Sequence, residues 1–336
     1  MITISACMIV KNEERVLRRC LDSLAGLVDE IILVDTGSAD RTKEIAQEYS
    51  CKIYDFQWID DFSAARNFSF SKAVMDYIYV ADADEVIDET NRERFMYLKQ
   101  CLLPEIDIVQ MLYTNQLAYN TTYNFNEEYR PKLFKRLRPF NWVDPIHETV
   151  MLQPVIYDSD IEILHMPEDN HAPRDFRVFQ NLIQKGIPFS DKLIGMYARE
   201  LYIAGEDQDF LEAEFFFTSL LQQEVFDDLL KQIQCILVRC GRIKNDSELI
   251  LRYALKNMAM GKASAEVCFE VGEYFYHKGD MAEAVIWFMN AAFETEAELN
   301  IHYCKDLPLN RIASCYEKSG NMAEAENFRE QYLSFS

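Results

Sequence analysis

The sequence predicts an α/β domain with a Rossmann-like, mixed sheet, followed by an all-α domain of helical repeats. In residues 1–100, apolar strand-like runs alternate with segments of helical periodicity, the pattern of βαβ units. Residues 107–165 are strand-like, aromatic and interrupted by prolines, and beyond Pro173 only helical periodicity remains. We therefore predict a first domain at residues 1–172 and a second at 173–336.

The composition excludes several classes of protein. The chain has 336 residues, of which 49% are hydrophobic, and a formal net charge of −22. A field of that sign repels nucleic acid and anionic membranes, and no apolar run has the length of a membrane-spanning helix. The nine cysteines form no C-x-x-C pair, which indicates free thiols in a reducing compartment. We expect a cytoplasmic protein with no nucleic-acid partner and no membrane insertion.

The elements of the first domain follow from local patterns. The apolar run at the N-terminus reaches a charge at Lys11 without a basic segment before it, so it predicts a strand and not a signal peptide. Asp40 and Ser63 are expected to cap helices. The predicted strands are Ile2–Val10, Glu30–Val34, Cys51–Tyr54 and Tyr77–Ala81, and the predicted helices are Glu13–Leu24, 40–49 and 63–72.

The middle of the chain is rich in tyrosine and asparagine. Tyr113, Tyr119, Tyr123, Phe125 and Tyr129 lie within a short stretch. Sugars and peptides both bind well to aromatic faces, so this stretch is a candidate acceptor platform. The alternative is ordinary packing of core and loops.

A repeat marks the second domain. The six residues that begin at Gly279 (GDMAEA) recur almost unchanged at Gly320 (GNMAEA), with a looser copy at Gly205 and a degenerate one at Gly241. The spacings of 36, 38 and 41 residues are close to the tetratricopeptide period. We predict stacked pairs of antiparallel helices, each glycine ending a first helix in a left-handed conformation. The alternative is an irregular helical bundle.

The strongest chemical signal is Asp82-x-Asp84. Two other D-x-D sequences occur, at 158–160 and 207–209, but only Asp82 and Asp84 directly follow a buried strand of the predicted parallel sheet. Ligands of such sheets bind at the carboxyl ends of the strands. Two carboxylates there can hold Mn²⁺ or Mg²⁺, which in turn bridges phosphate groups. The alternative is a turn or a helix cap.

Three further motifs accompany this one. They are Ile9-Val10-Lys11-Asn12-Glu13-Glu14, Val34-Asp35-Thr36-Gly37-Ser38-x-Asp40-x-Thr42 and Ala64-Ala65-Arg66-Asn67. In this order and spacing, the four motifs resemble the catalytic domain of the family 2 glycosyltransferases, which implies the GT-A fold. With the helical repeats behind it, the chain is similar to bacterial peptide glycosyltransferases of the sublancin S-glycosyltransferase type. Those enzymes use a nucleotide sugar, typically UDP-glucose, and modify a cysteine or serine of a bacteriocin precursor.

The resemblance implies a role for each matching residue. Asp35 would accept a hydrogen bond from the uracil ring, although it could be a turn residue only. Arg66 would bind the diphosphate, although it could form a surface ion pair. Asp84 would bind the metal, and Asp82 the ribose or a metal-bound water. The other nucleotide-sugar residues would be Val10, Lys11, Glu13 and Ala83, with Glu85 supporting the metal-binding side chains.

A second cluster of polar residues follows Trp142. His147 is a candidate metal or phosphate ligand, and His165, at the end of a predicted strand, competes with it. A histidine at a strand end can also be purely structural. An acceptor hydroxyl needs a base, for which we select Glu148 first and Asp144 second.

The resemblance and these residues predict a metal-dependent, inverting glycosyltransferase. It would move a sugar from a UDP-sugar to a cysteine or serine side chain of a peptide or protein. One alternative is a transferase for cell-surface polysaccharide or glycolipid, and another is a non-catalytic peptide-binding scaffold. The helical domain is expected to bind the acceptor or a second copy of the chain, giving a homodimer.

Overall fold

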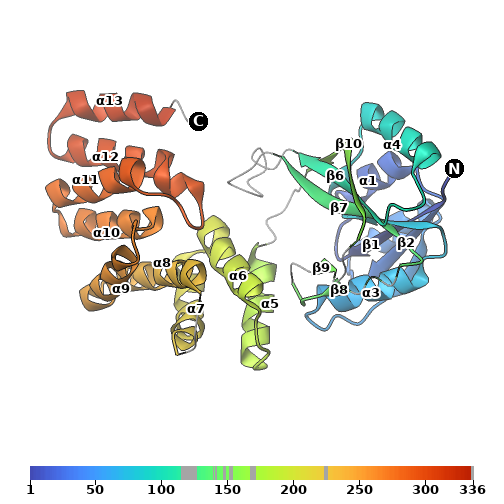
Figure 1. The fold of residues 1–336 in the computed structure, drawn as a ribbon, viewed down its shortest axis with the longest axis horizontal. Helices are drawn as coiled ribbons and strands as arrows, with labels where there is room; N and C mark the ends of the chain where they lie inside the picture. Colours follow the sequence, from blue (N-terminus) through green and yellow to red (C-terminus); the bar gives the residue numbers. More distant parts are fainter. Residues whose placement is uncertain are drawn as a thin grey trace. The chain divides into compact units, whose positions relative to one another are not determined.

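The computed structural model describes residues 1–114, 127–138, 140, 142–146, 149–150, 154–166, 172–222 and 226–333. It contains two compact units, Met1–Pro173 and Arg174–Ser336 (Figure 1). The aromatic segment at 115–126, which contains most of the predicted acceptor platform, lies outside the described residues.

An eight-stranded mixed sheet forms the centre of the first unit, in the order β3-β2-β1-β4-β7-β6-β10-β5. Strands β3, β2, β1 and β4 are parallel, β7 runs antiparallel to both β4 and β6, and β5 runs antiparallel to β10. The predicted fold class, a mixed-sheet α/β domain followed by helices, is confirmed. The strands are β1 (Ile4–Val10), β2 (Glu30–Asp35), β3 (Lys52–Asp55), β4 (Tyr77–Ala81), β5 (Glu85–Val86), β6 (Ile108–Thr114), β7 (Glu128–Lys135) and β10 (Ile156–His165), with a separate β8 (Trp142–Val143) and β9 (Thr149–Val150) pair.

Helices cover both faces of this sheet (Figure 1). On β1, Ala6 and Met8 belong to one buried apolar cluster and Cys7 to another, because successive side chains of a strand point to opposite faces. The first cluster includes residues of α1 (Leu17–Leu24), α2 (Thr42–Glu48) and α4 (Glu89–Cys101). The second packs against α3 (Phe62–Lys72) and β8.

The predicted helix starts need correction. Helix α3 begins at Phe62, two residues earlier than a cap at Ser63 predicts. Its cap is Asp61, which accepts a hydrogen bond of 3.0 Å from the Ala64 amide. The Ser63 hydroxyl instead donates to Asp61 at 2.7 Å. Helix α1 begins at Leu17, because residues 12–14 are hydrogen-bonded to the loop before α2.

The second unit consists of helices, as predicted. Gly279 (φ 82°) and Gly320 (φ 80°) follow α10 and α12 in the left-handed conformation. Gly205 does not, with φ −75°, and Gly241 lies within α8, so the predicted role of these two glycines is wrong. A Cβ at position 205 would lie 2.6 Å from the Leu201 carbonyl oxygen, so close packing requires that glycine. The helices are α5 (Ala172–Gln184), α6 (Asp191–Ala204), α7 (Asp207–Leu220), α8 (Asp227–Ile243), α9 (Ser247–Ala259), α10 (Ala265–Lys278), α11 (Met281–Met289), α12 (Asp306–Lys318) and α13 (Met322–Leu333).

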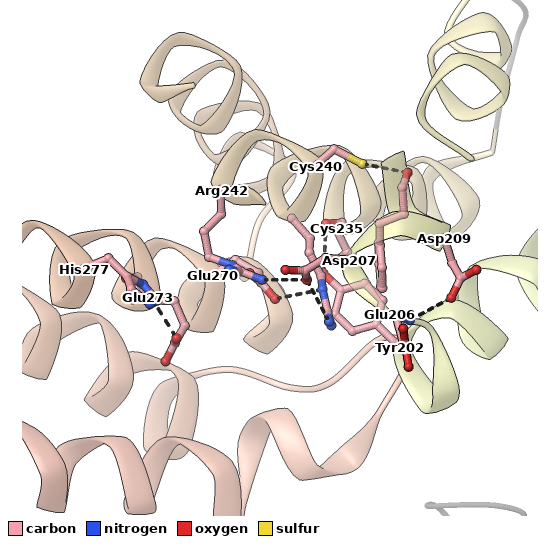
Figure 2. A network of polar contacts seen from close by, with 12 residues as sticks. Tyr202, Glu206, Asp207, Asp209, Cys235, Cys240, Arg242, Glu270, Glu273 and His277 are labelled. Carbon is pink, nitrogen blue, oxygen red and sulfur yellow. Dashed lines mark hydrogen bonds and ion pairs between the residues drawn. The ribbon is translucent and has the colours of Figure 1, made fainter. Parts of the chain in front are cut away.

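Polar contacts join the first helices of consecutive pairs (Figure 2). The Tyr202 hydroxyl of α6 donates to the Cys235 carbonyl of α8 at 2.9 Å. Arg242 of α8 forms an ion pair with the buried carboxylate of Glu270 on α10 (Figure 2). Glu273, also on α10, pairs with Arg311 of α12 at 2.5 Å. Among the described helices, none has the length and apolar character that would let it cross a membrane.

The segment between α11 and α12 folds back onto these first helices. The Glu266 carboxylate of α10 accepts hydrogen bonds of 2.7–3.1 Å from the backbone amides of residues 298–300. Asn300 donates to the Tyr202 carbonyl at 3.0 Å, and Tyr303 accepts from Arg239 at 2.8 Å. The chain itself therefore covers part of the face that α6, α8 and α10 share.

Candidate functional site

Three of the predicted site residues, Val10, Asp35 and Asp82, come together at the carboxyl edge of the sheet. Val10 and Asp35 are paired at the ends of β1 and β2, and Asp82 follows β4, the neighbour of β1 on its other side. Carboxyl ends of parallel strands share one edge of a sheet, so a ligand there can reach all three loops.

Two loops at this edge are joined by side-chain hydrogen bonds. The Asn12 amide donates to the Ser38 hydroxyl at 2.9 Å, and the Asn12 side chain accepts from the Ala39 amide at 2.8 Å. The Glu13 amide donates to the Thr42 hydroxyl at 2.8 Å. Asn12 has φ 59°, a left-handed conformation that asparagine tolerates. The exposed Lys11 thus lies on an ordered backbone shelf.

Asp35 is buried and its carboxylate is occupied by its own turn. It accepts hydrogen bonds of 3.1–3.2 Å from the amides of Gly37 and Ser38, and Lys43 lies 3.3 Å away. Burial alone would raise the pKa of Asp35, but the hydrogen bonds from Ser38, Gly37 and Lys43 outweigh it and lower the pKa below its usual value. Asp35 is therefore a turn residue, and its contact with a base stays a prediction.

The Asp82–Glu85 turn presents carboxylates of different exposure. The Asp82 side chain is 47% exposed and that of Asp84 11%. Glu85 is buried, and its carboxylate accepts a hydrogen bond from the Asp82 amide at 3.1 Å. Its two carboxylate oxygens also lie 2.6 and 2.8 Å from Lys132 Nζ. Partial burial raises the pKa of Asp82, but the positive charges of Lys132 and Arg66 outweigh this effect, and the pKa lies below its usual value. Asp82 is thus an anion at neutral pH.

Asp84 is in direct contact with His165. The His165 Nε2 atom lies 3.1 Å from Asp84 Oδ2, because β5 and β10 pair with His165 opposite Glu85. The His165 ring also packs on Tyr113, at 4.9 Å between centroids. In the part of the chain that the structure describes, no three histidine, cysteine or acidic side chains form a ready-made metal site.

One carboxylate and one imidazole nevertheless fit a divalent cation that a ligand's phosphates also bind. Mg²⁺ typically takes one or two protein carboxylates and completes its shell with water and phosphate oxygens. The donor set of Asp84 and His165, with the exposed Asp82 nearby, agrees with that chemistry.

Arg66 is buried and lies next to Asp82. Its guanidinium is 3.9 Å from Asp82 Oδ1 and lies over the Trp142 ring at 5.3 Å. The alternative of a surface ion pair is therefore wrong, since the Arg66 side chain is only 9% exposed. Asn67 and Trp142 exchange two hydrogen bonds, which join α3 to β8.

Of the remaining predicted residues, Ala83 and Asp144 are described by the structure, and His147 and Glu148 are not. Ala83 is buried, and Asp144 is partly exposed with φ 71°. The next residue, Pro145, accepts a hydrogen bond from the Phe62 amide at 2.8 Å, so Asp144 lies close to the start of α3.

Sequence reasoning missed Lys132, Arg130 and the contact made by Tyr113. Arg130 lies 4.0 Å over the Tyr113 ring, and Lys132 is buried against Glu85. The sequence did contain a signal: Arg130 and Lys132 lie at alternating positions of β7. Alternating residues of a strand lie on the same face, so two positive charges there predict a negatively charged neighbour. Of the other D-x-D sequences, Asp209 completes a capping box at α7.

Parts of the chain are similar in sequence to known proteins. The pattern of the family described as Glycosyl transferase family 2 matches residues 5–153. The SPbeta prophage-derived glycosyltransferase SunS of Bacillus subtilis is 25% identical over 261 residues, 71% of this chain and 58% of that protein. A TPR repeat-containing protein of Synechococcus elongatus is 52% identical over 85 residues, 25% of this chain and 21% of that protein. The chain therefore spans less than two thirds of the length of these curated relatives.

A weaker similarity exists to a solved structure. Glucosyl-3-phosphoglycerate synthase from Mycobacterium tuberculosis, in complex with Mg²⁺ and UDP, has a TM-score of 0.40 and 17% identity, over 56% of this chain and 81% of that one.

Proposed function

We propose that the protein is a metal-dependent, inverting glycosyltransferase that uses a UDP-sugar, because residues 5–153 match the family described as Glycosyl transferase family 2. One observation carries the proposal: Arg66, Asp82 and the Asp84–His165 pair lie together at the carboxyl edge of the sheet, beside the turn of Asp35. This edge is where sheets of this kind bind ligands.

The loops after β1 and β2 would hold the nucleotide. The backbone around Val10, Lys11 and Glu13 offers a shelf for the base, and Asp35 would accept from the uracil ring nitrogen. Arg66 would bind the diphosphate, since a guanidinium matches phosphate oxygens in charge and geometry. Its burial and its position over Trp142 reduce the entropy lost on binding.

The cation would be Mn²⁺ or Mg²⁺, held by Asp84 and His165 with Asp82 beside it. When bound, it neutralises charge that develops on the departing diphosphate. The protein's own part is to keep Asp84 and His165 in register through the pairing of β5 with β10.

The acceptor is proposed to be a cysteine or serine of a peptide or protein. The similarity to SunS and the two-part layout support it. The acceptor sulfur or oxygen forms a bond to the anomeric carbon while the bond to the diphosphate oxygen breaks, with inversion. The acceptor proton would pass to Glu148 or Asp144. A thiol needs this base less, because it is partly ionised near neutral pH.

The helical unit would bind the acceptor or a second copy of the chain. Residues 298–303 cover part of the face of α6, α8 and α10, so a partner would use the remaining surface. The nine cysteines are all free thiols, which supports a cytoplasmic location.

The test combines binding with product analysis. UDP affinity is measured by calorimetry with Mn²⁺ and with EDTA, for wild type and Asp84→Asn. We expect a large loss of affinity in EDTA for wild type and little metal dependence in the variant. Candidate peptides are then incubated with UDP-sugars, and their intact masses are measured by mass spectrometry. We expect a mass increase of one hexose, located on a cysteine or serine. Equal UDP affinity with and without metal would contradict the metal role, and a scaffold would bind peptide without any mass change.

A further inference from the structure

A buried ion pair lies directly beneath the Asp82–Glu85 turn. Lys132 Nζ contacts both carboxylate oxygens of Glu85, at 2.6 and 2.8 Å. The two side chains are only 4% and 2% exposed. Lys132 comes from the middle of the sheet, on β7, and its ammonium group also lies 5.7 Å from the rings of Tyr79 and Tyr113.

Glu85 connects this pair to the backbone of the turn. Its Oε2 atom accepts the Asp82 amide at 3.1 Å, and its own amide donates to the Asp82 carbonyl at 3.2 Å. On the other side, the Met166 amide donates to the Asp84 carbonyl at 3.0 Å. The turn is thus held at both aspartates. At Asp82 the Glu85 carboxylate binds the backbone amide, and the Glu85 amide and the Cys20 thiol bind the carbonyl.

Burying this ion pair is energetically unfavourable compared with burying two apolar side chains. Each ion loses its hydration when it is buried, and an apolar pair of similar volume is often equally stable or more so. A contact that contributes little net stability but fixes a backbone amide points to geometry as its role.

We propose that the Glu85–Lys132 pair is a positioning device, which holds the Asp82 backbone so that Asp82 and Asp84 are arranged for the cation before it binds. Lys132 and Glu85 touch neither cation nor donor; they act through the turn. The part that concerns the cation rests on the proposed function, whereas the ordering of the turn does not.

Charge alone would have a different consequence. Lys132 and Glu85 carry opposite charges, so replacing both by apolar residues leaves the net formal charge near Asp82 and Asp84 unchanged. The loss of the nearby Lys132 ammonium group would, by itself, favour binding of a cation. A loss of cation affinity in such a double variant would therefore report on geometry. Replacing Lys132 alone would leave a buried carboxylate without its counter-ion, which strongly destabilises a folded protein, so this single variant is not used.

The test uses the full chain with Glu85→Leu/Lys132→Met, and Lys132→Arg as the conservative variant. The matched control is Asp29→Leu/Lys99→Met. That pair, 2.6 Å apart, also holds a backbone amide, that of Ile4 at 2.8 Å, but at the opposite end of β1. Two quantities are measured: hydrogen exchange of the 82–85 amides without metal or nucleotide, and UDP affinity with Mn²⁺ and with EDTA.

In Glu85→Leu/Lys132→Met we expect faster exchange at the Asp82 amide, and Mn²⁺-dependent UDP affinity lower by about 10–100-fold, the usual effect of removing a supporting partner of a metal ligand. UDP affinity in EDTA should stay within about twofold of wild type. Lys132→Arg should retain most of the affinity, and the control should change neither quantity.

Unchanged exchange and unchanged Mn²⁺-dependent affinity in the double variant would overturn the proposal. An equal loss with and without Mn²⁺ would also overturn it, because the pair would then be a general core contact. If wild type itself shows no effect of Mn²⁺, the proposed function fails, and the exchange of the Asp82 amide still decides whether the pair holds the turn.

Discussion

Asn67 and Trp142 are joined by two hydrogen bonds between a side-chain amide and a backbone. Asn67 Oδ1 accepts from the Trp142 amide at 2.9 Å, and Asn67 Nδ2 donates to the Trp142 carbonyl at 3.0 Å. The Trp142 ring, fixed in this way, lies under the guanidinium of Arg66, the residue before Asn67. The position of Arg66 at the site thus depends on a contact between α3 and β8.

Asn67→Ala should therefore lower both stability and UDP affinity. Leaving the Trp142 amide without its partner costs about 1–3 kcal/mol of unfolding free energy. UDP affinity should fall because the aromatic support of Arg66 is lost. Urea unfolding and calorimetry measure the two effects.

The chain offers a matched control in the helical unit. Asn257 makes a similar double contact with Ser264: it accepts from the Ser264 amide at 2.8 Å and donates to the Ser264 hydroxyl at 3.0 Å. Asn257→Ala should lose comparable stability and leave UDP affinity unchanged. If both variants lowered UDP affinity alike, the Asn67 effect would be one of general stability, with no specific role at the site.

Asp35→Ala should weaken UDP binding by about 1–3 kcal/mol, the scale of a charged hydrogen bond in a partly buried site. The comparison is Asp40→Ala, because Asp40 also holds turn amides, those of Thr42 and Glu14, at 3.0 and 3.1 Å. Asp40→Ala should reduce stability with a smaller loss of UDP affinity. Equal losses in calorimetry would make Asp35 a turn residue only.

Glu200 gives the helical unit a pH-dependent stability. Burial, with the nearby charge of Asp175, raises the pKa of Glu200 to about 7. An unfolded glutamate titrates near about 4.3. The folded state therefore binds the proton more tightly, and the stability from Glu200 is complete below about pH 4 and is lost as the pH rises through about 7.

Glu200→Gln should unfold at a higher temperature than wild type at pH 8, and this difference should shrink towards pH 5. Thermal unfolding monitored by circular dichroism measures it. Glu248→Gln is the control, since that side chain is 80% exposed. A temperature difference for Glu200→Gln that is the same at both pH values would refute the prediction.

The sequence predicted those parts of the site that depend on residues close together in the chain. Asp35 and Asp82 follow apolar strands directly, and the ends of parallel strands must share an edge. Lys132 could not be placed, because its position depends on β7 entering between β4 and β6, a pairing such as Tyr79 with Leu133 that spans 54 residues. The sequence shows that β7 carries positive charges, but it does not show which strands lie beside β7.

The errors in the helices have a similar cause. Asp61 and Ser63 are both good caps, and the choice between them depends on which oxygen reaches the Ala64 amide. Gly205 and Gly279 occupy the same place in the repeat, but only Gly279 needs a left-handed conformation. Sequence similarity alone cannot distinguish a glycine that is needed for φ from one needed for close packing.

Asp144 and Glu148 are the two candidates for the base that takes the proton of a hydroxyl acceptor. Asp144 follows Trp142 by two residues and holds φ 71°, a strained conformation for a residue other than glycine and one found often at functional sites. Asn tolerates this conformation, so Asp144→Asn should fold normally. Glu148 remains the first candidate from the sequence.

We expect Glu148→Gln to keep UDP-sugar binding and to lower turnover with a serine peptide at least about 100-fold, the lower end of a general-base contribution. Asp144→Asn should then have a small effect, and the reverse result would assign the base to Asp144. With a cysteine peptide both losses should be smaller, because the thiolate forms without a base. Turnover within a few-fold of wild type for both variants, on the serine peptide, would exclude both carboxylates, and the proton would have to leave through water or through the donor's own phosphate.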